Sequence, residues 1–348
     1  GQLAETTVAA TRSSPVQIGT LTDWAAVAAG GVHSLAKKTD GTIWAWGQGN
    51  TGPLGEITTT ASRSSPIQIG TLTSWASVAG GFSHSLARKT DGTIWAWGLG
   101  SNGLLGEITA AVSRSSPVQI GTLTSWSSVA ASRTHSLARK TDGTIWAWGD
   151  GASGTLGQVS TIASRSSPVQ IGTLTDWAAA TGSVSHSLAT KTDGTLWAWG
   201  LGTTAGQLGD SAKINRSSPV QIGTLTSWSL VSAGESHSLA TKTDSTLFSW
   251  GLATSGQLGN NEDGTRFSPV QIGTLTAWAS IGIGHSHSLA VKTEGTLWVW
   301  GIGSNGQLGE TATTANRSSP VQIGTLTDWA AAVGGISHSL ARKTDNTV

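Results

Sequence analysis

The chain of 348 residues contains no cysteine, no methionine and no tyrosine, and only 11% of its residues are charged. Without cysteine, disulfide bonds and thiolate metal sites are excluded. The 20 basic and 19 acidic side chains leave a net charge of +1, and no basic run or acidic tail indicates a nucleic-acid or membrane-surface partner. No stretch approaches the roughly 18 consecutive apolar residues of a membrane span. We therefore expect neither nucleic-acid binding nor insertion into a membrane.

The chain is instead rich in tryptophan, in glycine and in repetition. It has 18 Trp and 47 Gly, and the segment HSLARKTDGTIWAWG occurs unaltered at positions 84–98 and 135–149. A Ser-Pro step recurs every 51 residues, apart from one interval of 50, with its proline at Pro15, Pro66, Pro117, Pro168, Pro219, Pro269 and Pro320. This period predicts a single domain of seven repeat units spanning residues 1–348.

Each unit has the pattern of four short strands. In the second unit they are WASVAG (75–80), HSLARKT (84–90), TIWAWG (93–98) and SPVQI (116–120), β-branched or aromatic runs bounded by Gly, Ser, Thr and Pro. Asp91-Gly92 predicts a two-residue hairpin turn with positive φ at both central positions. Asp244-Ser245 departs from this pair in the fifth unit, so that hairpin is expected to be the least favourable.

A four-stranded unit of this size cannot bury both of its faces alone, whereas seven units stacked around an axis can. The repeat therefore predicts an all-β fold, a seven-bladed β-propeller of four-stranded antiparallel blades. Trp95 and Trp97 lie two residues apart and share one face of their strand, with Ile94 and Ala96 on the other. We expect both faces to pack against neighbouring blades, large rings against small side chains.

The last blade is expected to be closed by both termini. Residues 329–334 and 338–343 supply two strands, Gly1-Gln2-Leu3 matches the loop at 306–308, and Pro15 to Ile18 can supply the outermost strand. Most of the third strand is lacking, which would leave the outer strand without a partner. We expect the natural chain to continue beyond Val348; the alternative is a strand donated by another molecule.

The recurring motifs SPVQI, WxxVAxG, HSLAxKTDGTIWAWG and GQLG resemble the regulator of chromosome condensation repeat, especially in its bacterial versions. The resemblance covers the whole chain and implies the propeller fold. Similar propellers include a guanine-nucleotide exchange factor, a plant ultraviolet-B photoreceptor and a bacterial β-lactamase inhibitor, so the resemblance alone implies no single activity.

Residues that could carry chemistry recur once per unit, which favours structural roles. Each unit has a His followed by Ser-Leu-Ala, and we expect these side chains to satisfy backbone groups. The Arg that precedes each Ser-Pro segment is expected to pair with a neighbouring blade or a carbonyl, the alternative being a phosphate or DNA contact. His285 and His287 could touch a metal, yet no third ligand is near in sequence. We therefore predict no catalytic residues, no metal site, no cofactor and no enzyme activity.

The units differ most in two connections, from first to second strand and from third to fourth strand. In an antiparallel sheet these connections emerge on the same side, so the variable loops should share one face. Loops on a rigid scaffold commonly carry binding sites. Phe82, Arg133, Glu235 and His285 are therefore the predicted partner-binding residues, although sequence drift without a partner would give the same pattern.

These observations favour a non-catalytic scaffold for protein binding or surface display. A multivalent carbohydrate-binding propeller is the main alternative, and it requires first-strand tryptophans such as Trp24 or Trp75 to be exposed at the rim. An exchange factor and an ultraviolet-B sensor are further alternatives. The location stays open between the surface or exterior of a bacterial cell and the cytoplasm, and the sequence names neither the partner nor the oligomeric state.

Overall fold

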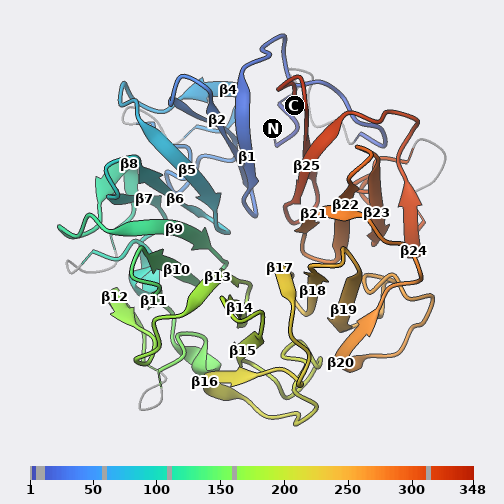
Figure 1. The fold of residues 1–348 in the computed structure, drawn as a ribbon. Coiled ribbons are helices and arrows are strands. Elements are labelled where there is room, and N and C mark those ends of the chain that lie inside the picture. Colours follow the sequence, from blue (N-terminus) through green and yellow to red (C-terminus); the bar gives the residue numbers. More distant parts are fainter. Residues whose placement is uncertain (1, 5–11, 57–60, 108–111, 159–162, 311–314) are drawn as a thin grey trace.

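The computed structural model describes the chain except for residue 1 and residues 5–11, 57–60, 108–111, 159–162 and 311–314. Its strands form small antiparallel sheets arranged around a central axis, as in a β-propeller (Figure 1). Within each sheet the strand nearest the axis comes first in the sequence and the remaining strands follow outward. Both chain termini lie in the same part of the ring, between β1 and β25 (Figure 1).

The strands recur in a fixed order in each unit. The first strands are β1 (Trp24–Ala29), β5 (Trp75–Gly80), β9 (Trp126–Ala131), β13 (Trp177–Gly182), β17 (Trp228–Ala233), β21 (Trp278–Ile283) and β25 (Trp329–Gly334). The second strands are β2 (His33–Lys38), β6 (His84–Lys89), β10 (His135–Lys140), β14 (His186–Lys191), β18 (His237–Lys242), β22 (His287–Lys292) and β26 (Ser339–Lys343).

The third and fourth strands are present in six units of the described part of the chain. The third strands are β3 (Ile43–Gly47), β7 (Ile94–Gly98), β11 (Ile145–Gly149), β15 (Leu196–Gly200), β19 (Leu247–Gly251) and β23 (Leu297–Gly301). The fourth strands are β4 (Arg63–Gln68), β8 (Arg114–Gln119), β12 (Arg165–Gln170), β16 (Arg216–Gln221), β20 (Arg266–Gln271) and β24 (Arg317–Gln322). Two short 3₁₀ turns, η1 (Ser101–Gly103) and η2 (Ala152–Gly154), lie in the loops between third and fourth strands.

The expectation of seven four-stranded blades is wrong. Six sheets have four strands, and the seventh, β25-β26, has two. Pro15 to Ile18, expected as the outermost strand of that blade, form no strand. The backbone N–H of Ile18 still donates to the carbonyl of Val348, the bond that the equivalent isoleucine makes in complete sheets. Without a described third strand to pair with, however, the segment has no ladder to extend.

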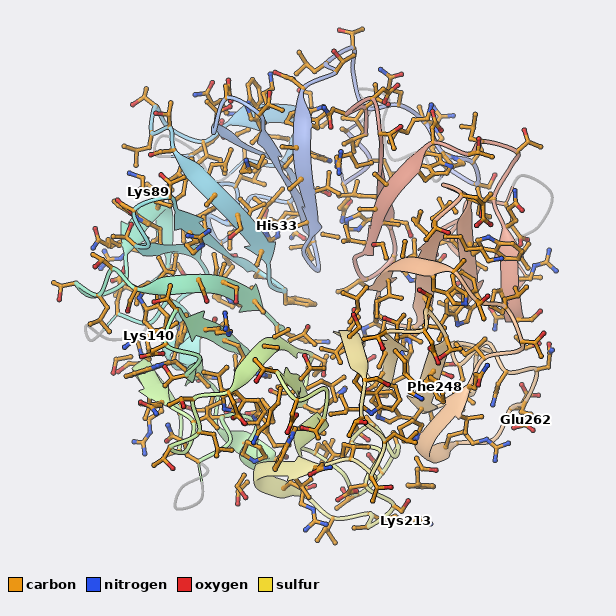
Figure 2. All side chains as sticks on the ribbon, in the orientation of Figure 1. His33, Lys89, Lys140, Lys213, Phe248 and Glu262 are labelled. Atoms are coloured by element: carbon orange, nitrogen blue, oxygen red, sulfur yellow. The ribbon has the colours of Figure 1, made fainter. Side chains whose placement is uncertain are left out.

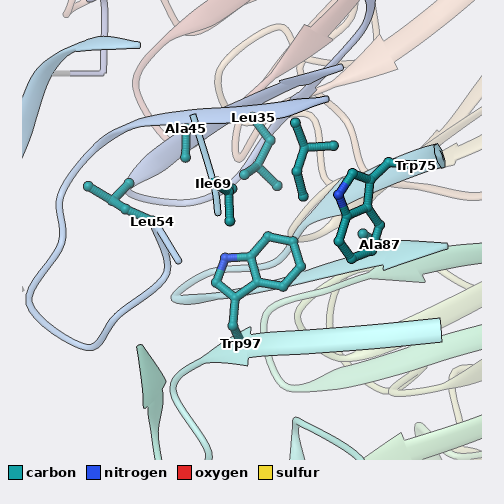
Figure 3. Close-up of a cluster of buried hydrophobic side chains, with 8 residues drawn as sticks. Leu35, Ala45, Leu54, Ile69, Trp75, Ala87 and Trp97 are labelled. Carbon is teal, nitrogen blue, oxygen red and sulfur yellow. The ribbon is translucent and has the colours of Figure 1, made fainter. Parts of the chain in front are cut away.

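Apolar clusters between neighbouring sheets form the core. In the first cluster, Leu35 and Ala45 from one sheet pack against Trp75 and Trp97 from the next, and all four are at most 1% exposed (Figure 3). The opposite face of β7, which carries Ile94, packs against the following unit. The predicted packing of large rings against small side chains across both faces is therefore confirmed in the described sheets. Each ring truncated to Ala should cost about 3–5 kcal/mol.

The hairpin between second and third strands is not the predicted two-residue turn. The N–H of Gly92 donates to the Lys89 carbonyl at 3.0 Å, and the Lys89 N–H donates to the Thr93 carbonyl at 2.9 Å. Only Gly92 has a positive φ, +80°, so the loop is a three-residue turn that ends in a left-handed residue. Asp91 stays in an ordinary conformation because its carboxylate accepts hydrogen bonds from the N–H and the hydroxyl of Thr93.

Candidate functional site

The variable connections between first and second strands meet around the axis of the propeller. They and the ends of the first strands line a cavity of about 370 Å³ on one face of the ring. The hairpins between second and third strands lie on the opposite face. There the backbone N–H of Trp75, at the start of β5, donates to the carbonyl of Gly41 in the hairpin of the preceding unit. The first of these two faces is therefore the one on which the units differ.

One position in this connection carries a different residue in every unit. The equivalent residues are Gly31, Phe82, Arg133, Val184, Glu235, His285 and Ile336, and all line the axial cavity. We call this set the rim. The rim backbone is tied to the next unit: the Phe82 N–H donates to the Ser132 carbonyl at 3.3 Å and the His285 N–H to the Gly335 carbonyl at 3.1 Å. Side chains thus vary on a backbone that is held in place.

The structure brings the four predicted partner-binding residues together in two pairs. The guanidinium of Arg133 lies over the ring of Phe82, 4.4 Å from its centroid, close enough for a cation–π interaction. His285 Nε2 contacts the carboxylate of Glu235, and the two side chains are 31% and 33% exposed. One part of the rim is therefore aromatic and cationic, and another carries an acid beside an imidazole.

Beneath the rim, the repeated histidines form a closed ring that sequence reasoning did not foresee. Each Nε2 bonds the serine hydroxyl of the next unit rather than the expected backbone groups, and the last one, His338, reaches Ser34 of the first unit at 3.2 Å. The pairs are His33–Ser85, His84–Ser136, His135–Ser187, His186–Ser238, His237–Ser288, His287–Ser339 and His338–Ser34. The signal for this ring was the invariant His-Ser dipeptide itself.

The hydrogen bonds also assign the protonation of these rings. The Ser136 hydroxyl donates to the Leu104 carbonyl, so His84 Nε2 must carry the hydrogen that it shares with Ser136. Its Nδ1 is buried and has no partner among the described residues. Burial lowers the pKa of His84 to about 4 and that of His135 to about 3. Neutral, enclosed imidazoles of this kind are structural groups.

Five of the seven repeated arginines form an ion pair with an acid of their own unit: Arg63–Glu56, Arg114–Glu107, Arg216–Asp210, Arg266–Glu262 and Arg317–Glu310. Arg114 places Nε and Nη2 on the carboxylate of Glu107, with Nε at 3.0 Å from Oε2, and Arg317 does the same with Glu310. Both acids lie in the loop that precedes the fourth strand. This pairing raises the pKa of Arg114. A guanidinium whose fork is already filled by a carboxylate is a poor site for phosphate.

The first-strand tryptophans are buried, which removes the basis of the carbohydrate-binding alternative. Trp24 and Trp75 are each 1% exposed. Trp24 meets Trp44 edge to face at 5.9 Å between centroids, and Lys38 Nζ lies 4.6 Å from the Trp44 centroid. A sugar therefore cannot reach the ring faces at this position.

The long loops between third and fourth strands are only partly within the described residues. Positions 57–60, 108–111, 159–162 and 311–314 lie outside them, so their predicted part in a partner surface has no structural account. Within the described residues, no group of three His, Asp or Glu side chains is placed to hold a metal ion. No helix among them has the length and apolar character to cross a membrane.

Known proteins similar to this chain share its repeat and its fold. The probable E3 ubiquitin-protein ligase HERC6 of Homo sapiens is 30% identical over 234 residues, which cover 64% of this chain and 23% of that protein. The ultraviolet-B receptor UVR8 of Arabidopsis thaliana is 28% identical over 235 residues, covering 66% of this chain and 53% of that protein. The chain thus spans less than a quarter of the first relative and about half of the second.

The solved structure of Kap60 bound to yeast RCC1 (Prp20) matches with a TM-score of 0.82 and 22% identity, covering 91% of this chain and 79% of that one. At this identity the match shows the fold alone. These relatives are eukaryotic, so the expected bacterial origin stays a prediction. The family model described as RCC1-like domain matches residues 1–341, and the chain therefore belongs to the RCC1-like domain family.

Proposed function

We propose that this chain is a non-catalytic protein-interaction scaffold whose partner surface is the rim. The observation that carries this proposal is the change of residue at one position in all seven units, on a backbone bonded to its neighbours. Packing cannot explain the change, because the core residues beneath repeat almost without variation. A surface that is asymmetric on a symmetric scaffold is what recognition of one partner requires.

The chemistry of the rim suits a protein partner. Arg133 stacked on Phe82 offers an apolar and cationic patch, and Glu235 beside His285 offers an acidic one. Aromatic and arginine side chains are enriched at the energetic centres of protein interfaces. Support also comes from the yeast relative, whose solved structure is a complex with another protein, Kap60.

The activities in the names of the other relatives are not extended to this chain. HERC6 is named as a ubiquitin ligase, but this chain matches 23% of its length. UVR8 is named as an ultraviolet-B receptor, but the second indole of each third strand here, such as Trp97, is fully enclosed between units and hydrogen-bonded. No observation in the described residues favours either activity over protein binding.

Photo-crosslinking followed by affinity measurement tests the proposal. A photoreactive phenylalanine analogue at position 82 should capture a partner, and the same analogue at position 72, on the opposite face, should not. Phe82→Ala, Arg133→Ala and Glu235→Ala combined should then weaken binding of that partner by at least about 100-fold, with the melting temperature little changed.

A matched variant on the opposite face provides the control. Leu72, Leu123 and Leu174 are 41%, 45% and 41% exposed in the connections between units. The triple change of these leucines to alanine should leave the affinity within about threefold of the unmodified protein. Equal affinities of the two triple variants would reject the rim as the partner surface.

A further inference from the structure

The mouth of the axial cavity carries one cation and one anion above apolar walls. Below the rim, the ends of the first strands line the cavity with small or aliphatic side chains such as Val27 and Val78. Among the described residues that line it, the charged side chains are Arg133 and Glu235, and the imidazole is His285. An occupant therefore meets apolar side chains inside the cavity and two opposite charges at its mouth.

The two charges lie on opposite sides of the axis. Arg133 and Phe82 follow the first strands β9 and β5, whereas Glu235 and His285 follow β17 and β21. Figure 1 shows β5 and β9 across the axis from β17 and β21. The rim residues that separate the two pairs around the ring are apolar, namely Val184, Ile336 and Gly31. The rim is therefore bipolar, with apolar residues between its charged parts.

The cationic part of the rim is held in place by a glycine. A Cβ built on Gly31 would lie 2.7 Å from Phe82 Cδ2, so the Phe82 ring lies directly on this glycine. The Arg133 guanidinium lies over the same ring, and the three residues form one stack across three units. Stacking uses the face of the guanidinium, so the N–H groups in its plane stay available for a carboxylate.

The acidic part of the rim is held by two links between the fifth and sixth units. The Glu235 N–H donates to the His285 carbonyl at 3.3 Å, and His285 Nε2 contacts the Glu235 carboxylate. A carboxylate has about four acceptor sites on its two oxygens, so one imidazole leaves capacity for a cation. Both side chains are partly exposed, and a partner can therefore reach the carboxylate.

This arrangement selects among the partners that the proposed function leaves open. A partner that covers the mouth removes water from both charges, and each then needs an opposite charge from the partner. A uniformly anionic segment would bring negative charge to Glu235, and a uniformly basic segment would bring positive charge to Arg133. The cavity of about 370 Å³ is near the lower end of the roughly 300–1,000 Å³ of ligand pockets, so it suits a side chain or the tip of a turn.

We propose that the rim binds a projecting loop of a partner protein in which an acidic and a basic residue flank an aliphatic residue. The aliphatic side chain enters the axial cavity, the acidic residue accepts hydrogen bonds from Arg133, and the basic residue donates to Glu235. Because the two charges differ, the loop binds in one orientation across the axis. This inference rests on the proposed function and adds the chemistry and orientation of the partner.

Selection from a phage-displayed library of disulfide-cyclised heptapeptides, with the whole chain as the target, tests the proposal. Peptides that also bind the triple alanine variant of the rim are removed first. We expect the remaining sequences to carry an acid and a base on either side of an aliphatic residue. A selection that enriches no sequence, or only sequences of uniform charge, would overturn the proposal.

Charge reversal then measures the two contacts with a selected peptide. Arg133→Glu and Glu235→Arg should each weaken binding at least about 10-fold, because each places like charges together. The double variant should prefer, by at least about 10-fold, a peptide whose acid and base are exchanged. Lys37→Glu changes the net charge equally in β2, beside the hairpin of the opposite face, and should leave the affinity within about threefold. Equal affinities of the two peptides for the double variant would contradict the bipolar contact.

The outcomes separate this inference from the proposed function. A partner captured at position 82 that is weakened by the triple alanine variant, but by neither charge reversal, would leave the rim as the partner surface and overturn the bipolar loop. A dimer of this chain that either reversal dissociates would assign the rim to a second copy and overturn it as well. A partner that binds the triple alanine variant unchanged would overturn both.

Discussion

Acidification between pH 7 and pH 5 should unfold the protein through its histidine ring. Burial is the main cause that lowers the pKa of His84 and His338 to about 4 and that of the other five ring members to about 3. The pKa of a histidine in the unfolded chain is about 6.5. Below that pH the unfolded chain binds more protons than the folded one, so the free energy of unfolding decreases as pH falls toward the folded values.

The size of the effect follows from the number of rings. At pH 5 each histidine should destabilise the fold by about 2 kcal/mol, and at pH 6 by about 1 kcal/mol. The whole ring then removes about 14 kcal/mol at pH 5, comparable with the total stability of about 5–15 kcal/mol that is typical of a domain. We therefore expect the acid transition between about pH 5 and pH 6, well above the range in which carboxylates protonate.

Urea unfolding followed by tryptophan fluorescence at several pH values measures this slope. The aspartates of the hairpins, such as Asp91, also have a lowered pKa, because Thr93 donates two hydrogen bonds to the carboxylate, but they act only below about pH 4. His84→Gln keeps an N–H donor for Ser136 and should reduce proton uptake on unfolding by one. A free energy of unfolding that stays constant from pH 7.5 to pH 5.5 would refute the reasoning.

Four further substitutions test the packing and turn arguments by thermal or urea unfolding. Ser245→Gly should stabilise the fold by about 1 kcal/mol, because Ser245 has φ +62° where five other hairpins have glycine; no gain would contradict the strain. Trp97→Ala should cost about 3–5 kcal/mol and the partly buried Trp95→Ala less, so equal losses would contradict the inter-sheet packing. Ser136→Ala should cost about 1–3 kcal/mol, because it leaves His84 Nε2 without its acceptor, and an unchanged midpoint would contradict the ring.

Strand positions were predictable because each is encoded within one unit. The segment 75–80 is β5 itself, and the strand expected at 93–98 begins one residue later, at Ile94. The predicted type of hairpin turn was wrong, because Asp91-Gly92 is compatible with both a two-residue and a three-residue turn. The hydrogen bonds from Thr93 to the Asp91 carboxylate decide between them. Local sequence could not rank those two turns.

Features that depend on neighbouring units were harder to predict. The blade count was wrong because a repeat in the sequence does not guarantee that every strand finds a partner, as the segment Pro15 to Ile18 shows. The variable face followed from strand alternation, but the contact of Arg133 with Phe82 joins two units and has no signal in either one. The hydrogen bond from each histidine to a serine also joins two units, so the sequence of a single unit does not indicate it.

The closed ring of histidines and serines bears on how the protein comes apart. A linear array of repeats has two terminal units, which fray first and require polar caps. Here His338 bonds Ser34, so the last unit is joined to the first and the circle has no terminal repeat to cap. Loosening any one unit breaks contacts on two sides at once, which couples all the sheets into one cooperative transition. Local unfolding should begin at the sheet with the fewest strands, β25-β26. Backbone amide hydrogen exchange should therefore be fastest there.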